Sequence, residues 1–117
     1  MIKDATYASL LFDFYGKLLP EKQEEVMIYY HEDNLSLSEI AENLNITRQG
    51  VHYILKSAEK TLEEHEKKLC LVDRYLLNIK RVEESKAKLE KLVYTNDDIE
   101  KNKILNELNK ILDSFAE

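Results

Sequence analysis

The chain has 117 residues, of which 44% are apolar and 34% are charged, and its formal net charge is −6. This length predicts one domain, and the balance of apolar and charged residues is typical of globular proteins rather than disordered chains. Two glycines and one proline are too few for the turns of a β-rich fold, so we expect an all-α protein.

Several functional classes are disfavoured by the sequence. No apolar run approaches the roughly 20 residues that cross a bilayer, and the first residues do not resemble a signal peptide. The one cysteine, Cys70, is interpreted as a buried structural residue in a protein of the reducing cytoplasm. The three histidines are scattered and no glycine-rich phosphate loop is present. We therefore expect no enzymatic activity, no bound metal and no cofactor.

The first two predicted helices follow from apolar residues at spacings of three and four. One such pattern covers residues 4–19, which predicts an amphipathic helix. A second helix is predicted to begin at Pro20, because proline suits the first helical turn and Glu21 and Glu24 complement the positive end of the helix dipole. The polar stretch 31–34 ends it.

A short third helix and the start of a fourth are predicted from capping residues. Ser36 and Glu39 have the spacing of a capping box, which places the helix start at Leu37. We expect this helix to end near Leu44, because Asn45 accepts the left-handed conformation. Thr47 can then cap the next helix.

From Arg48 to about Tyr94 the pattern predicts a long helical region, broken or kinked near 63–68. Residues 95–98 form a cap and turn cluster before the last helix. We expect residues 1–66 to form a helix-turn-helix DNA-binding region and residues 67–117 a helical extension for packing or dimerisation, within one compact domain. One apolar seam is predicted along the long region: Val51, Leu55, Ala58, Leu62, Leu69, Val72, Leu76 and Ile79.

The segment 37–56 has the residue pattern of a helix-turn-helix, in which two short helices pack over a three- or four-residue turn. Ala41 is the small residue where the helices cross, and Ile46 is expected to plug the turn. The alternative is a plain αα-hairpin inside a bundle. The apolar residues expected to pack between the two helices are Ile40, Leu44, Val51, Ile54 and Leu55.

If the pattern is a helix-turn-helix, the outward face of its second helix contacts DNA in the major groove. Arg48 can bind guanine and Gln49 can bind adenine, each through two hydrogen bonds. Lys56 and Ser38 are better placed for phosphates. Gly50 either permits close approach to the DNA backbone or has no special role. The predicted DNA-binding residues are Ser38, Thr47, Arg48, Gln49, His52, Tyr53 and Lys56.

The charge distribution supports two functional hypotheses. Residues 45–60 hold three basic groups and one acidic group, whereas residues 1–44 hold three basic and nine acidic groups. The positive segment coincides with the predicted recognition helix, as DNA binding requires, although it is small and favours two subunits. The acidic first 44 residues favour the alternative, a non-enzymatic adaptor that binds protein or ribonucleoprotein.

The sequence also resembles known families. The run 35–44, followed by Ile46-Thr47-Arg48-Gln49-Gly50-Val51, resembles region four of the sigma factors. The whole chain is similar to the YlxM-type family of small helix-turn-helix proteins from low-GC Gram-positive bacteria, through Tyr29-Tyr30, the run 47–49 and Glu59-Lys60.

This resemblance implies a DNA-binding regulator. It also implies a regulatory or accessory role beside the signal recognition particle pathway, whose genes lie next to those of the family. For the helical extension two arrangements stay open, folding back on the helix-turn-helix or pairing with a second copy. We expect a homodimer, because two subunits read two half-sites.

Overall fold

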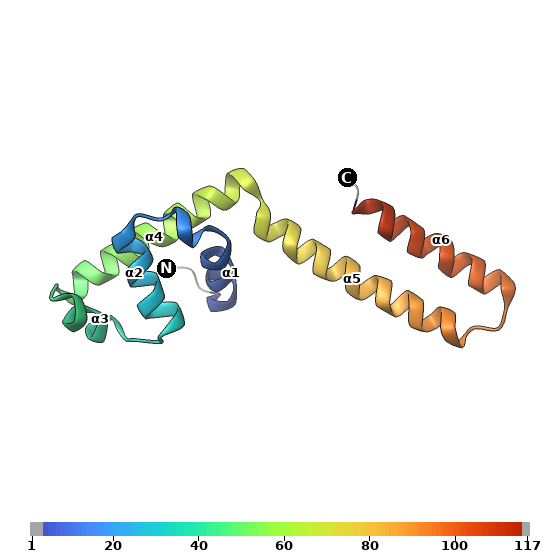
Figure 1. The fold of residues 1–117 in the computed structure, drawn as a ribbon, viewed down its shortest axis with the longest axis horizontal. Coiled ribbons are helices and arrows are strands. Elements are labelled where there is room, and N and C mark those ends of the chain that lie inside the picture. Colours follow the sequence, from blue (N-terminus) through green and yellow to red (C-terminus); the bar gives the residue numbers. More distant parts are fainter. Residues whose placement is uncertain (1–3, 116–117) are drawn as a thin grey trace. The chain divides into compact units, whose positions relative to one another are not determined.

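The computed structural model describes residues 4–115, and all regular elements among them are helices. This confirms the prediction of an all-α fold. The chain divides into two compact units, Met1–Val72 and Asp73–Glu117, called here the first and the second unit. Figure 1 follows the helices of both in chain order.

Four α-helices build the first unit. Helix α1 covers Ala5–Tyr15 and continues into a 3-10 turn, Gly16–Leu18. Helix α2 covers Glu21–Met27, α3 covers Leu37–Leu44 and α4 covers Arg48–Leu69. Helices α3 and α4 begin at the predicted residues, and α1 and α2 each begin one residue after the predicted start, because Asp4 and Pro20 are the residues that precede the first turn.

The end of α2 has a conformation that the sequence did not predict. A π-helical turn, Ile28–Glu32, extends the helix, and the Asp33 amide donates to the Ile28 carbonyl at 3.0 Å. Asn34 then takes a left-handed conformation with φ 55°, which ends the helix. The π turn places His31 against α4.

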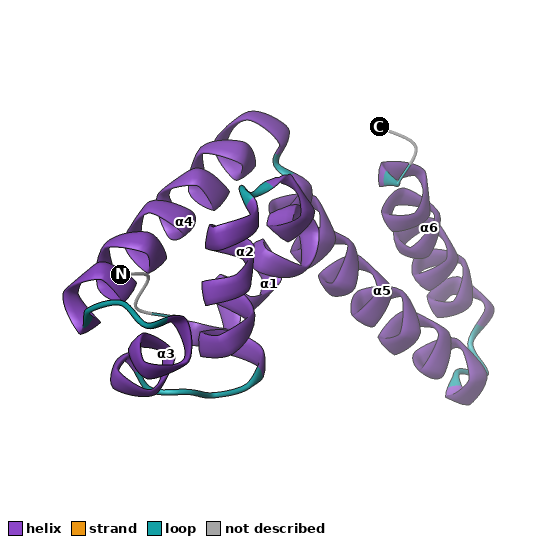
Figure 2. Ribbon diagram, turned by 60° about the vertical axis from the view of Figure 1, so that its left-hand side comes forward, coloured by secondary structure: helices purple, strands orange, loops and turns teal. Residues whose placement is uncertain are grey.

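Helix α4 is the central element of the first unit and packs against α1, α2 and α3 (Figure 2). Its residues Val51, Leu55, Ala58 and Leu62 are all fully buried, which confirms the first half of the predicted seam. The other buried members of this core are Leu11, Phe12, Tyr15, Leu19, Val26, Met27, Ile40, Ala41 and Val72.

The break after α4 lies later than predicted. The helix is regular through 63–68 and ends at Leu69, where Cys70 takes a left-handed conformation with φ 55°. Helix α5 then begins at Leu71 and runs to Tyr94. Cys70 is exposed, so the interpretation as a buried cysteine is wrong: a residue at this corner points its side chain into solvent.

The second unit is an αα-hairpin made of α5 and α6, Asp98–Ser114. Arg81 donates to the Ser114 carbonyl, and Lys88 pairs with Glu107, so the two helices are antiparallel. Asp97 caps α6 by accepting from the Ile99 amide at 3.0 Å. Ile104 and Leu108 are buried, whereas Leu69, Leu76 and Ile79 are exposed. The predicted seam is therefore buried over its first half and at Val72, and it is uncovered at these three positions.

Candidate nucleic-acid interface

The helix-turn-helix is made by α3, the turn 45–47 and the beginning of α4. The Ser36 hydroxyl accepts from the Glu39 amide at 3.1 Å, and the Glu39 carboxylate accepts from the Ser36 amide at 3.2 Å. This is the predicted capping box, and it fixes the start of α3. Asn45 ends α3 in the left-handed conformation with φ 54°, as predicted. The turn is therefore specified at both ends by local side chains.

Packing between α3 and α4 follows the predicted pattern in the core and departs from it at the turn. Ile40 and Ala41 of α3 are buried together with Val51 and Leu55 of α4. Ile46, predicted to plug the turn, is 37% exposed. It precedes the cap of α4 and lies over the first turn, where a Cβ built on Gly50 would be 3.8 Å from its Cδ1. Ile46 therefore covers the start of α4 instead of filling the core.

Thr47 and Gly50 together fix the first turn of α4. The Thr47 hydroxyl accepts from the Gly50 amide at 2.9 Å, which confirms the predicted cap. A Cβ added at Gly50 would lie only 3.1 Å from this hydroxyl oxygen. A side chain at this position would therefore need the Thr47 hydroxyl to shift by a few tenths of an ångström, a contact that the sequence alone did not reveal.

Most of the predicted DNA-binding residues are on the surface. Ser38, Thr47, Arg48, Gln49, Tyr53 and Lys56 are exposed, and His52 is half-buried. At about 100° per residue, Gln49, Tyr53 and Lys56 lie on the side of α4 opposite its buried residues. Lys60, which is also exposed, lies on this side four residues after Lys56. Lys60 is absent from the predicted set, although its spacing from Lys56 identifies it.

A buried polar pair lies behind this face. His31, in the π turn after α2, has its Nε2 atom 3.9 Å from an Oε1 oxygen of Glu59 on α4, and both side chains are nearly buried. Burial lowers the pKa of His31, and the nearby Glu59 carboxylate opposes this in part. Nε2 has no hydrogen-bond partner among the described residues. Periodicity gave no signal for this pair, because the two residues come from different elements.

A second buried polar group links α1 to the end of α4. The Tyr15 hydroxyl donates to Glu66 Oε1 at 2.5 Å and accepts from the Leu71 amide at 3.1 Å. The Val72 amide donates to the same Glu66 oxygen at 2.9 Å. Burial and the hydrogen bond to Glu66 raise the pKa of Tyr15. These side chains satisfy the first amides of α5, which a helix cannot satisfy within itself.

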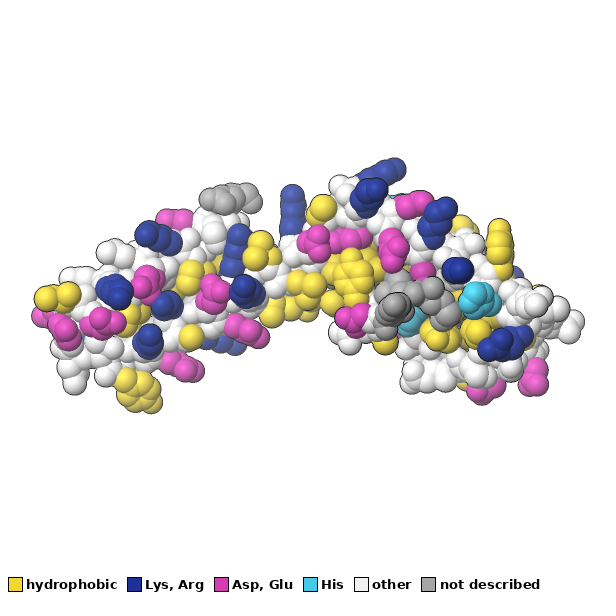
Figure 3. Space-filling view, turned by 180° about the vertical axis from the view of Figure 1, so that it is seen from behind, with side chains coloured by type: hydrophobic (Ala, Val, Ile, Leu, Met, Phe, Trp, Pro, Cys, Tyr) yellow, Lys and Arg dark blue, Asp and Glu magenta, His cyan; other side chains and the backbone are white. Residues whose placement is uncertain are grey.

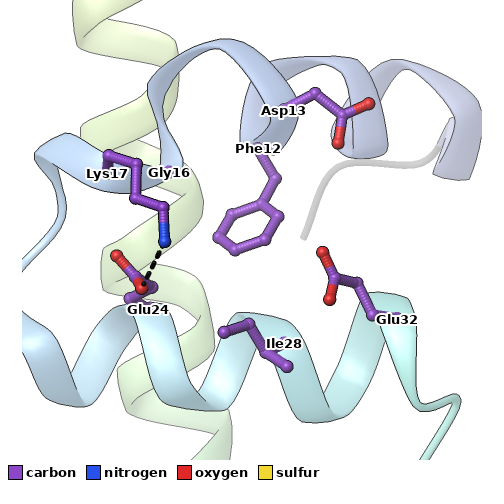
Figure 4. Close-up of a pocket in the computed structure, with 7 residues that line it drawn as sticks. All are labelled: Phe12, Asp13, Gly16, Lys17, Glu24, Ile28 and Glu32. Atoms are coloured by element: carbon purple, nitrogen blue, oxygen red, sulfur yellow. Dashed lines mark hydrogen bonds and ion pairs between the residues drawn. The ribbon is translucent and has the colours of Figure 1, made fainter.

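Helices α1 and α2 also border a small pocket of about 220 Å³. Figure 4 shows the ring of Phe12 between the two helices. The Lys17 ammonium lies 3.4 Å from Glu24 Oε1. Asp13, Glu24 and Glu32 put three carboxylates around one ammonium, a balance that disfavours phosphate. Nucleic acid is therefore better accommodated on α4 than in this pocket.

Metal-binding clusters and membrane-spanning helices are both absent from residues 4–115. Within this range, no three or more histidine, cysteine or acidic side chains are grouped so that they could hold a metal ion. None of the described helices combines the length and apolar character that a membrane span requires.

Comparison with known sequences gives consistent matches along the chain. Residues 2–105 match the sequence profile of a family described as "Putative helix-turn-helix protein, YlxM / p13 like". A UPF0122 protein of Clostridium acetobutylicum is 38% identical over 115 residues, covering 98% of this chain and 99% of the relative. A UPF0122 protein of Caldanaerobacter subterraneus is 45% identical over 86 residues, 74% of each chain. One from Bacillus mycoides is 37% identical over 99 residues, 85% of this chain and 90% of the relative.

Proposed function

The chain belongs to the YlxM/p13-like family of helix-turn-helix proteins, and on this premise we propose that it is a DNA-binding regulatory protein without enzymatic activity. One observation supports the proposal most. Arg48, Gln49 and Lys56 of the helix-turn-helix are all exposed, and they lie in the segment 45–60, which holds three basic groups and one acidic group.

The proposed contacts divide by position along α4. Arg48 and Gln49, in the first turn, contact base edges in the major groove, because residues near the start of a recognition helix reach furthest into it. His52 and Tyr53 lie next along the helix, and Lys56 contacts a phosphate. Thr47 and Ser38, just before α4 and near the start of α3, contact phosphates with their hydroxyl groups.

Two subunits are part of the proposal. Each copy has few cations on the exposed side of α4, and affinity for DNA depends on how many phosphates are neutralised. A homodimer doubles this number and reads two half-sites. In this arrangement residues 1–66 read DNA and residues 67–117 join the copies. The protein acts in the cytoplasm, in regulation beside the signal recognition particle pathway.

The proposal is tested by selecting genomic DNA fragments with the purified protein at about 0.15 M salt, where weak phosphate contacts no longer suffice. We expect a shared sequence motif among the bound fragments. Arg48→Ala and Gln49→Ala should each weaken binding to that motif by about 1–3 kcal/mol. Lys17→Ala is the matched control, since it removes an exposed cation from the α1–α2 side of the first unit; its affinity should stay close to that of the parent protein.

The adaptor is the second candidate, favoured by the nine acidic groups in residues 1–44. It predicts no enrichment of any fragment over bulk DNA and no retention on heparin at low salt. The same outcome contradicts the DNA-binding proposal. The partner would then be sought among proteins and structured RNA of the targeting machinery.

A further inference from the structure

The charges on the exposed side of α4 change sign along the helix. Lys56 and Lys60 come first, Glu63 and Glu64 follow one turn after Lys60, and Lys67 lies beyond them. All five of these side chains are exposed. The side of α4 that is open to solvent is therefore basic before residue 63 and acidic directly after residue 60.

Lys60 lies in the same row as residues of the candidate interface. At about 100° per residue, it is turned by about 180° from Val51, which is fully buried. Gln49, Tyr53 and Lys56 lie within about 40° of Lys60 around the helix axis. A duplex that meets the first of these residues therefore faces the same side of α4 as Lys60.

Both lysines of this row are available to an anion. The four ion pairs found within residues 4–115 include neither Lys56 nor Lys60. In Figure 3, basic side chains on the first unit, at the right, are interspersed with acidic ones rather than gathered in one large patch. Attraction to a phosphate therefore depends on the individual cations of the row.

The position of Lys60 along α4 suits a phosphate rather than a base. At about 1.5 Å per residue, it lies about 16 Å after Gln49 and about 6 Å after Lys56. The major groove is about 12 Å wide and about 8.5 Å deep. A helix that places Gln49 against base edges therefore carries Lys60 past the groove, to the strand that borders it. Lys56 and Lys60 are one turn apart, so both can contact phosphates of that strand.

The acidic residues after Lys60 limit the part of α4 that can face DNA. Glu63 and Glu64 lie within about 60° of Lys60 around the helix axis, and their carboxylates repel phosphates. Lys67, about 10 Å after Lys60, is separated from the basic part of the row by these two carboxylates. Lys60 is therefore the last cation of the row that a bound duplex can approach without meeting like charges.

We propose that Lys60 contacts a DNA phosphate and that the DNA-facing part of α4 ends at this residue. This inference rests on the proposed function, to which it adds one phosphate contact and the end of the interface. An ionic contact of this kind is independent of base sequence, so duplex DNA of random sequence is a sufficient probe.

The test measures the dissociation constant for a fluorescently labelled random-sequence duplex of about 30 base pairs, by anisotropy, at about 50 to 200 mM NaCl. The slope of log affinity against log salt concentration counts the phosphate contacts. Lys60→Gln should make this slope shallower by about 0.9 for each bound copy and raise the dissociation constant about five- to tenfold at about 0.1 M NaCl. Lys60→Arg keeps the charge and should keep the slope.

Lys67→Gln is the matched control, because it removes the same charge from the same side of α4 beyond Glu63 and Glu64. Its slope should equal that of the parent protein, and far-UV circular dichroism checks that each variant keeps its helices. An unchanged slope for Lys60→Gln, or an equal change for Lys67→Gln, would overturn the inference and leave DNA binding intact. If the parent protein shows no salt-dependent binding to the duplex, the proposed function fails, and this inference fails with it.

Discussion

In the first unit, α4 is enclosed by three other helices, whereas in the second unit α5 has one neighbouring helix, α6, which it contacts through Arg81–Ser114 and Lys88–Glu107. Both long helices carry apolar residues at the same spacing of three and four. In α4 these residues form the core, and in α5 most of them remain exposed. The comparison teaches that periodicity identifies an apolar face, but only the number of neighbouring elements determines whether the chain itself covers that face.

The largest expected effect comes from truncating one leucine in each unit. Leu62 is fully buried and Leu89 is 48% exposed. Leu62→Ala should lower the free energy of unfolding by about 2–5 kcal/mol, through lost burial and the cavity left behind. Leu89→Ala, measured in dilute protein where copies are apart, should change it by less than about 0.5 kcal/mol. Urea unfolding followed by circular dichroism measures both, and equal losses would contradict the contrast.

A smaller effect is expected from the hydroxyl of Tyr15, which connects α1 to Glu66 and to the Leu71 amide. Tyr15→Phe keeps the buried ring but leaves the Leu71 amide without its acceptor and removes a donor from Glu66. We expect a loss of about 1–3 kcal/mol in unfolding free energy. Tyr53→Phe, at a residue that is 73% exposed, is the control. A similar small change in both variants would show that the buried hydroxyl contributes little.

The pH dependence of stability should reveal His31. The pKa of His31 is lowered in the folded protein from its ordinary value of 6.5. When the pH is below 6.5, the unfolded chain therefore binds a proton at His31 more readily than the folded chain does. Stability from this residue is therefore fully present above that pH and decreases as the pH falls through it toward the folded-state pKa. His31→Gln should flatten this part of the curve. Urea unfolding from pH 7.5 to 5 measures the difference.

The smallest predicted effect is a gain at the corner between the helices. Cys70 has φ 55°, a conformation that strains residues with a Cβ, and its side chain is exposed. Cys70→Gly should raise the free energy of unfolding by about 0.5–1 kcal/mol, as relief of strain exceeds the added entropy of the unfolded chain. Cys70→Ala retains the Cβ and should give no gain. Equal stabilities of the glycine and alanine variants would contradict the strain.

The predictable parts of the fold are those specified by neighbouring residues. The capping box of Ser36, the left-handed Asn45 and the Thr47 cap are all local, and each was found from the sequence. The break at Cys70 was misplaced because its position depends on contacts between α1, α4 and the start of α5. The π turn and the His31–Glu59 pair likewise depend on packing between elements that lie far apart in the sequence.

In the candidate site, too, some features follow from local sequence and others depend on the three-dimensional structure. The exposed face of α4 follows from helical spacing, whereas the fit of Gly50 against the Thr47 hydroxyl requires coordinates. DNA contact by Arg48 and Gln49 stays a prediction.

The capping of α5 by Tyr15 and Glu66 has a consequence for amide hydrogen exchange. The Leu71 and Val72 amides donate to side chains of the first unit, so they exchange only when that unit opens. Amides from Tyr75 onward donate within α5, and they exchange when α5 frays or when it separates from α6. Protection should therefore change abruptly within one turn of a continuous helix, and that step reports the opening free energies of the two units in a single experiment.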